Sequence, residues 1–364
     1  MTILVNYIKS SLIYLILPTL IAVVLVPVIK YLGYRLDVYA LENERTVHHG
    51  KIVRIGGVAI FLAFIISMAF LFVADKTINS IIIGGIIIFF TGLIDDMIDL
   101  KPKIKMLMQA LAAFVVMYYG GIYIEILNLP FGISINTGIL SLVVTFFWIV
   151  GVTNALNLID GLDGLSSGVS IIVLVTISFI AFMMNRTDVA FIALVLTGAS
   201  LGFWFYNFHP ASIFMGDSGA LFLGFNIACL SLLGFKTATV ITLGFPIVIL
   251  VVPIADTLMA IIRRRLKGEK FDVADRGHLH HVLMYNLKLG HRNAVLVLYL
   301  TTLLFSMCSI ISFFNEKIGM ILLLILVFVF EIFIEYTGMI NPKYHPLMGL
   351  SRRIFGWPKK KEDN

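Results

Sequence analysis

Amide, carboxylate and glycine residues are concentrated in one short run of this 364-residue sequence, between two long apolar stretches. In order, the run contains Asn154, Asn157, Asp160, Gly161, Asp163 and Gly164. Asn154, Asn157 and Asp160 are spaced three apart, so they would project from one side of a helix. The glycines would let a ligand approach the backbone closely. A helix cap needs only one such residue, so we interpret the run as a candidate functional site beside a membrane.

A second cluster places Asp95, Asp96 and Asp99 directly after an apolar run, and three lysines follow, ending with Lys105. At helical spacing the carboxylates could share one face, where a cation would relieve their mutual repulsion. Mg²⁺ suits the cluster because it takes oxygen ligands and is usually held by one or two carboxylates plus phosphates. The alternative is a solvated helix end that is neutralised by its own lysines.

Isolated candidates lie in two later loops. Asp217 begins an apolar run, where a carboxylate could bind a ligand or cap a helix. The longest loop contains Arg276, His278, His280 and His281. Zinc would need a third or fourth ligand in tetrahedral geometry, and no cysteine can supply one. We therefore favour phosphate or sugar contact for the histidines.

The composition is that of an integral membrane protein, with 60% hydrophobic and 13% charged residues. A membrane span takes roughly 20 apolar residues, and the sequence predicts an all-α polytopic fold with about eleven transmembrane helices. The predicted spans are 11–32, 56–74, 78–94, 104–120, 138–158, 166–184, 189–207, 218–235, 238–262, 294–314 and 318–338. Residues 1–338 would form a single transmembrane catalytic domain, followed by a basic cytoplasmic tail, 339–364. Cys229 and Cys308 lie in apolar runs and predict neither a disulfide nor a metal site.

Basic residues predict the orientation in the membrane. Most of them fall in loops on one side, whereas the other side has only Lys9, Lys76, Arg186, Lys236 and Lys317. The N-terminus would therefore be outside and the C-terminus cytoplasmic, with every polar cluster on the cytoplasmic face. The net charge of +6 favours anionic lipid or phosphate ligands, and the scattered basic residues argue against nucleic acid. Arg54, beside a diglycine, could contact phosphate or merely belong to this asymmetry.

Three classes of function remain open on these grounds. A phosphoryl transferase acting on a lipid phosphate would use the acids for a divalent metal and the bases for phosphate. An intramembrane prenyltransferase would use two aspartate-rich magnesium clusters, which leaves the histidine loop without a role. A transporter would place its charges near mid-membrane in two related halves, whereas these acids lie at the ends of spans. The phosphoryl transferase is therefore favoured.

Four motifs resemble, in order and over essentially the whole chain, the polyprenyl-phosphate N-acetylhexosamine-1-phosphate transferases of glycosyltransferase family 4. The motifs are Asp95-Asp96-Met-Ile-Asp99, Asn154-Ala-Leu-Asn157-Leu-Ile-Asp160-Gly-Leu-Asp163-Gly, Phe214-Met-Gly-Asp217-Ser-Gly and His278-Leu-His280-His281. That family includes phospho-MurNAc-pentapeptide translocase. Asp99 and the histidine loop beginning at Arg276 resemble instead the branch that uses UDP-N-acetylglucosamine.

The resemblance implies transfer of GlcNAc-1-phosphate from UDP-GlcNAc to undecaprenyl phosphate, with release of UMP. This would be the first membrane step of a cell-envelope polysaccharide or teichoic acid pathway. The alternative donors are another UDP-N-acetylhexosamine and UDP-MurNAc-pentapeptide. The family also implies a homodimer in the bacterial cytoplasmic membrane.

The resemblance further implies roles for individual residues. Asp217 would be the main Mg²⁺ ligand and Asn157 a second one, with Mn²⁺ as the alternative ion. The substrate-binding residues would be Lys105, Asn154, Gly161, Asp163, Phe214, Arg276, His280 and His281. The catalytic residues would be Asp95, Asp96, Asp160, Asp163, His278, His280 and His281. In the family the Asp95–Asp96 pair would position or deprotonate the lipid phosphate. Because a phosphate monoester is already largely dianionic at neutral pH, with a second pKa near ~6, we favour positioning.

Overall fold

A computed structural model describes residues 2–40, 51–72, 75–129, 133–234, 244–268 and 277–339. The α-helices are α1 Thr2–Arg35, α2 Gly57–Leu71, α3 Lys76–Ile98, α4 Pro102–Phe114, α5 Leu140–Leu158, α6 Leu165–Met183, α7 Thr187–Asn207, α8 Gly216–Gly234, α9 Gly244–Ile249, α10 Val251–Lys267, α11 Leu279–His281, α12 His291–Phe314 and α13 Glu316–Thr337. Two π-helical turns, Val115–Tyr119 and Val282–Asn286, continue α4 and α11. The predicted helical membrane protein is confirmed at this level.

The described residues contain eight helices that are long and apolar enough to cross a membrane. Each of the eleven predicted spans coincides with helix, but three of them correspond to shorter or broken elements. The run 56–74 forms α2, of only 15 residues, and the run 104–120 divides between α4 and its π-helical turn. The run 238–262 is broken between α9 and α10, where Pro253 cannot donate a hydrogen bond to the carbonyl of Ile249. The count of eleven stays a prediction.

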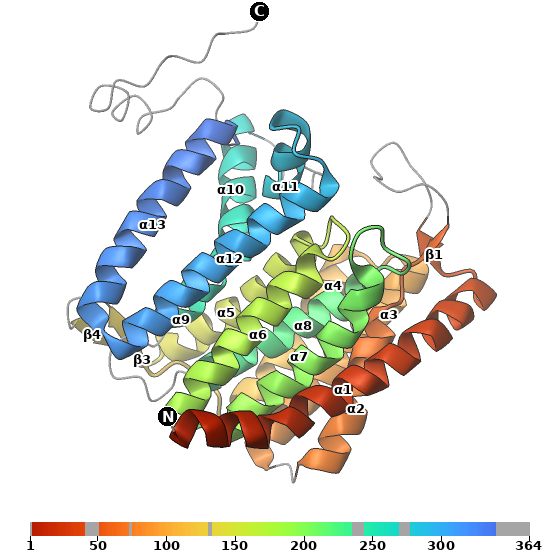
Figure 1. Cartoon of the computed structure of the whole chain (residues 1–364), viewed down its shortest axis with the longest axis horizontal. Helices are drawn as coiled ribbons and strands as arrows, with labels where there is room; N and C mark the ends of the chain where they lie inside the picture. The colour runs from red at the N-terminus through yellow and green to blue at the C-terminus, as the bar shows by residue number, and fades with distance from the viewer. Residues whose placement is uncertain are drawn as a thin grey trace, which may run out of the picture.

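Helix α8 lies at the centre of the bundle. Of the residues in its apolar stretch 89% are buried, against 17% in α13, and it packs against α2, α3, α5, α6 and α7. Figure 1 shows α1 running along α7, with α12 and α13 to one side of the bundle. Large apolar side chains such as Phe70 and Ile139 are exposed on the outside, as expected for surfaces that face lipid.

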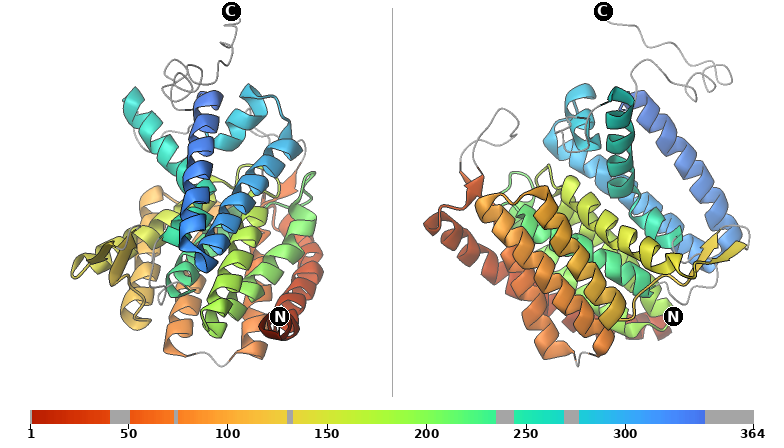
Figure 2. Two further views of the ribbon diagram at one scale, coloured as in Figure 1. Left: turned by 60° about the vertical axis from the view of Figure 1, so that its left-hand side comes forward. Right: turned by 180° about the vertical axis from the view of Figure 1, so that it is seen from behind.

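Two short antiparallel hairpins depart from the predicted all-α fold. Strand β1 (Tyr39–Ala40) pairs with β2 (Ile52–Val53), and β3 (Ile126–Leu129) pairs with β4 (Ile133–Asn136). The second hairpin projects from the side of the bundle (Figure 2). The first continues into a hydrogen-bonded contact with the segment before α8, in which Phe214 N–H donates to the carbonyl of Val53 at 2.8 Å. Backbone pairing over more than 150 residues of sequence therefore brings the β1–β2 hairpin to the start of α8.

Candidate active site

Several helix ends meet on the same side of the bundle and enclose a cavity of about 570 Å³. They are the C-terminal ends of α3, α5 and α7 and the N-terminal ends of α8 and α12, with the 159–164 loop between α5 and α6. The cavity is lined by Ala40, Ile52, Arg54, Asp96, Asn157, Asp160, Gly161, Leu162, Asp163, Asn207, His209, Pro210, Ala211, Phe214, Met215, Gly216, Asp217 and His291. Polar groups from five separate parts of the chain therefore share one wall.

Asp217 lies at the centre of a group of charged residues that we call the aspartate cluster. The cluster consists of Asp95, Asp96 and Asp217 with their cationic partners Lys105 and Arg54. The Lys105 ammonium lies 2.9 Å from Asp217 Oδ2 and 2.6 Å from Asp95 Oδ2. The single positive charge of Lys105 is thus shared between two carboxylates. The other oxygen of Asp95 accepts the Leu100 N–H at 2.7 Å, so both of its oxygens are engaged.

Asp96 holds the start of α8 in place. Its two carboxylate oxygens accept the backbone N–H groups of Asp217 at 2.9 Å and Ser218 at 3.0 Å. These are orphan donors of the first helical turn, and the positive end of the helix dipole favours an anion there. Arg54 Nε lies 3.5 Å from the same carboxylate. With its oxygens occupied by α8, Asp96 acts on Asp217 through the backbone.

Two glycines let the start of α8 lie close to α3 and to the backbone of Arg54. A Cβ on Gly92 of α3 would lie 2.5 Å from the carbonyl oxygen of Asp217. Gly216 has φ of +71°, and a Cβ there would lie 1.9 Å from the Arg54 carbonyl oxygen. Only glycine adopts this conformation without strain and also leaves that space. The Gly216-Asp217 sequence therefore fixes where the Asp217 carboxylate stands.

Asp160 adds a further acid to the wall. Burial, and then the negative charges of Asp217, Asp96 and Asp163, raise the pKa of Asp160 well above its ordinary value. Such crowding of acids favours a bound cation. Asn157 Nδ2 lies 3.1 Å from Asp217 Oδ1, and turning the amide over would offer its oxygen beside that carboxylate. Asp217 and Asn157 thus form an oxygen donor set that suits Mg²⁺.

The histidine motif lies behind the cavity. Asp256 of α10 accepts the Leu279 N–H at 2.6 Å, and its other oxygen lies 2.8 Å from His278 Nδ1. The His280 ring packs against Gly161, where an added Cβ would lie 2.4 Å from its Nε2. Burial, followed by the charge of His281, lowers the pKa of His280 to about 3. His280 is therefore neutral at physiological pH and supports the backbone of the 159–164 loop.

The structure brings most of the predicted residues together, though not all of them into the cavity. Those that line it are Asp96, Asn157, Asp160, Gly161, Asp163, Phe214 and Asp217. Asp95, Lys105 and His280 contact residues of the lining, Asp95 through its backbone carbonyl to Arg54. Asn154 instead faces α4, where its Nδ2 donates to Gln109 Oε1 at 2.6 Å, and His278 pairs with Asp256. The His281 ring lies tilted against that of His280, while Arg276 lies outside the described residues.

Sequence reasoning gave no role to His209, His291 or Asn207, all of which line the cavity. Asn207 ends α7 and His209 lies in the short loop that leads to Asp217, so both could be singled out on that ground. His291 is the first residue of α12, and its sequence context gives no signal. Arg54, for which the sequence allows either phosphate contact or a place in the charge asymmetry, reaches the aspartate cluster because the β1–β2 hairpin pairs with the segment before α8.

Comparisons with known proteins identify the family of the chain. Residues 78–235 match the model of "Glycosyl transferase family 4". The chain is 37% identical over 339 residues to a probable undecaprenyl-phosphate N-acetylglucosaminyl 1-phosphate transferase of Bacillus subtilis, covering 92% of this chain and 94% of that protein. It is 34% identical to the decaprenyl-phosphate N-acetylglucosaminephosphotransferase of Mycobacterium tuberculosis, over 75% of each chain.

A phospho-N-acetylmuramoyl-pentapeptide-transferase of Listeria monocytogenes is 36% identical over 190 residues, which is 49% of this chain and 58% of that protein. The two GlcNAc-phosphate transferases therefore match along much more of the chain. From the family match and the near full-length similarity to the Bacillus protein, the chain belongs to glycosyl transferase family 4.

Proposed function

We propose that this protein transfers GlcNAc-1-phosphate from UDP-GlcNAc to undecaprenyl phosphate. An oxygen of the lipid phosphate attacks the sugar-proximal phosphorus of the donor and forms a new P–O bond. The P–O bond to the uridylyl group breaks, and UMP leaves with that electron pair. The products are undecaprenyl-diphosphate-GlcNAc and UMP.

The observation that best supports this proposal is the aspartate cluster at the N-terminus of α8. Donor diphosphate and acceptor phosphate are strongly anionic, so an active site must neutralise them while holding them in line. Lys105 and Arg54 supply positive charge, and the α8 terminus supplies backbone N–H groups. The names of the Bacillus and Mycobacterium relatives describe transfer of the same sugar phosphate to polyprenyl phosphates.

Asp217 and Asn157 would hold Mg²⁺, with Mn²⁺ able to replace it. The bound ion would offset charge on the diphosphate and on the departing UMP. Lys105, now between Asp95 and Asp217, would then be released from Asp217 to contact phosphate. Asp160 lies near enough to Asp217 for the two negative charges to interact. Its carboxylate would add to the electric field that attracts the ion.

The engaged oxygens of Asp95 and Asp96 argue for positioning rather than proton removal. Asp95 holds Lys105 and the α3–α4 turn, and Asp96 holds Asp217. A lipid phosphate that is already dianionic at neutral pH has no proton that must be removed before attack. Both acids would therefore act on the reaction through the groups they orient.

We propose a cytoplasmic active site on an inner-membrane, multi-pass protein. The N-terminus and the described end of α13 lie at opposite ends of the molecule, and the β1–β2 hairpin lies at the α13 end (Figure 1). Described basic residues gather there, including Lys51, Lys101 and Arg292. The basic tail from 339 onward would follow on this side, and the protein would act as a homodimer that starts a cell-envelope polymer.

The direct test offers purified protein undecaprenyl phosphate together with one donor at a time. UDP-GlcNAc should give a labelled lipid diphosphate and UMP, whereas UDP-GalNAc and UDP-MurNAc-pentapeptide should react far more slowly. The more extensive match to the GlcNAc-phosphate transferases supports this order. Preferential use of the pentapeptide donor would replace the proposed function with its alternative.

A further inference from the structure

Helix α10 buries charged side chains and exposes apolar ones. Asp256 is 1% exposed and Arg263 is 4% exposed, and their spacing of about two turns places them on one face of the helix. Leu258 and Ile262 lie on the opposite face and are exposed. A buried charge is costly unless it is paired, and the function proposed above gives neither charged residue a role. The groups that they contact indicate what these residues do.

Asp256 holds the start of the histidine motif with both of its carboxylate oxygens. Oδ1 accepts the Leu279 N–H at 2.6 Å, and Oδ2 lies 2.8 Å from His278 Nδ1. A carboxylate can accept from both groups at once, with Nδ1 as the donor. Leu279 is the first residue of α11, so its N–H has no acceptor within that helix. One side chain of α10 therefore fixes the beginning of α11 and the orientation of the His278 ring.

Arg263 fixes the residue that precedes the motif. Its guanidinium lies against Gly277, where an added Cβ would lie 2.3 Å from Arg263 Cζ. Its Nη1 donates to the carbonyl of Met339, just beyond α13, at 3.0 Å. Gly277 is followed directly by His278 and Leu279, so two charged side chains of α10 together hold three consecutive residues. The start of the histidine motif is thus anchored to α10.

The histidine motif in turn contacts the cavity wall. The His280 ring is buried and lies against Gly161, where an added Cβ would lie 2.4 Å from His280 Nε2. The rings of His278 and His280 are stacked, with centroids 5.8 Å apart and planes 10° from parallel. The orientation of the first ring therefore restrains the second. Because Gly161 lines the cavity, a shift of α11 would move the 159–164 loop.

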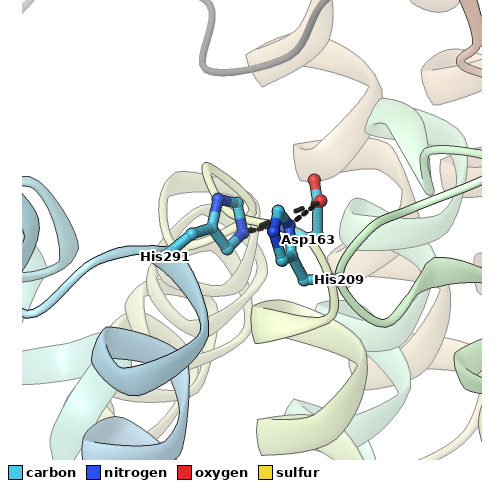
Figure 3. Close-up of side chains that lie close together, drawn as sticks. All are labelled: Asp163, His209 and His291. Atoms are coloured by element: carbon cyan, nitrogen blue, oxygen red, sulfur yellow. Dashed lines mark hydrogen bonds and ion pairs between the residues drawn. The ribbon is translucent and has the colours of Figure 1, made fainter.

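The other end of the 159–164 loop is held by different elements. Asp163 donates its backbone N–H to His291 Nε2 at 2.9 Å, and its carboxylate lies 2.7 Å from His209 Nδ1. Figure 3 shows these three side chains together. His291 is the first residue of α12, and His209 precedes α8. Loss of the contacts of Asp256 would therefore displace the Gly161 end of the loop while the Asp163 end stays attached.

We infer, on the basis of the proposed function, that Asp256 is a positioning residue for the transfer reaction. It lies outside the cavity lining and acts through His278, α11 and the backbone of Gly161. The loop residue before Gly161 is Asp160, whose carboxylate interacts with the charge of Asp217. Displacement of the loop would therefore disturb the aspartate cluster. A shift of about 1 Å in a positioned group can slow a reaction by about 10²-fold.

The test compares Asp256→Leu with Asp256→Asn in the full-length protein, with UDP-GlcNAc and undecaprenyl phosphate as substrates. Asp256→Leu keeps the volume but removes both acceptors, so kcat should fall about 10–100-fold. Asp256→Asn still offers one oxygen to the Leu279 N–H and an amide to His278, so kcat should stay within about threefold of wild type. Thermal midpoints in detergent, measured beside the rates, ensure that each variant is assayed folded.

A coupling experiment tests whether Asp256 acts through His280. His280→Ala should lower kcat about tenfold, and adding it to Asp256→Leu should lower kcat no more than about twofold further, because both changes break one route. Val252→Ala is the matched control: Val252 is a buried residue of the same helix, so its truncation should lower the thermal midpoint and leave kcat unchanged.

Three results would overturn the inference and leave the proposed function intact. They are an Asp256→Leu protein with the kcat of Val252→Ala, a loss in Asp256→Asn as large as that in Asp256→Leu, and fully multiplicative losses in the double variant. If Asp256→Leu does not fold, His278→Leu breaks the same pair from its other side, and a wild-type kcat there would overturn the inference. A wild-type protein that makes no lipid diphosphate from UDP-GlcNAc would overturn the proposed function and the inference with it.

Discussion

The two polar clusters of the cavity use carboxylates in the same way but orient different partners. In the aspartate cluster, the acids hold a lysine, an arginine and the N–H groups of α8. In the histidine cluster, which consists of Asp163, His209 and His291, Asp163 holds the His209 imidazole and a loop N–H. The first arrangement concentrates charge at the start of α8, and the second joins two histidines to one carboxylate. We therefore expect the anionic phosphates of the substrates to meet the aspartate cluster rather than the histidine cluster.

The largest expected effect belongs to the centre of the aspartate cluster. Asp217→Asn should lower the transfer rate by about 10³-fold, because an amide offers Mg²⁺ a dipole in place of a full charge. Its thermal midpoint in detergent should stay close to that of wild type, since Asp217 takes its position from backbone contacts. Near wild-type activity at ordinary Mg²⁺ would move the metal to Asp95 and Asp96.

Substitution of Asp96, unlike that of Asp217, should lower both the stability of the folded protein and the transfer rate. Asp96→Ala removes the acceptor for two N–H groups of α8, and loss of a helix cap costs about 0.5–2 kcal/mol. The rate should fall about 10–100-fold because Asp217 loses its support. Asp75→Ala is the matched control: Asp75 caps α3 at its other end, so it should lower stability similarly and leave the rate unchanged. Equal rates for the two variants would refute positioning by Asp96.

Asp95 offers a test through pH. Asp95→Asn should lower kcat/KM about tenfold, by a constant factor from about pH 5.5 to 8.5 with Mg²⁺ saturating, because Asp95 only holds Lys105 and the following turn. A general base would behave differently. Its loss should matter most at low pH, where the lipid phosphate is a monoanion, and a defect that shrinks tenfold as the pH rises would show that Asp95 removes a proton.

The smallest effect concerns His280, behind the cavity. Its pKa is lowered to about 3 by burial, whereas an unfolded histidine titrates near ~6.5. Between these values the unfolded chain binds a proton that the folded protein does not. Stability should therefore fall by about 1.4 kcal/mol per pH unit as the pH drops below ~6. Thermal midpoints in detergent from pH 7 to 5 should fall less steeply for His280→Gln than for wild type, and parallel curves would contradict a neutral buried ring.

The sequence predicted the helices well because long apolar runs have few alternatives in a membrane. It also grouped Asn157, Asp160, Asp163 and Asp217 correctly, since their motifs follow the ends of such runs. It could not predict that Asp96 caps a helix 120 residues later, because that contact depends on how α3 and α8 pack.

Two other features also depended on tertiary structure. Asn154 has the same helical spacing as Asn157, yet it turns toward Gln109 because α4 packs against α5. His291 follows a glycine at a helix start, a position with no special signal, and only the fold brings it to Asp163. Local pattern located the acids that line the cavity, whereas the residues that orient them emerged only from packing.

The central claim is that the metal and the reaction belong to the aspartate cluster, and Mn²⁺ binding tests it most directly. Electron paramagnetic resonance of Mn²⁺ titrated into purified wild type, Asp217→Asn and Asp163→Asn compares the two clusters without turnover. We predict one bound ion in wild type and in Asp163→Asn, and greatly weakened binding in Asp217→Asn. Unchanged binding in Asp217→Asn together with its loss in Asp163→Asn would place the metal in the histidine cluster and contradict the account.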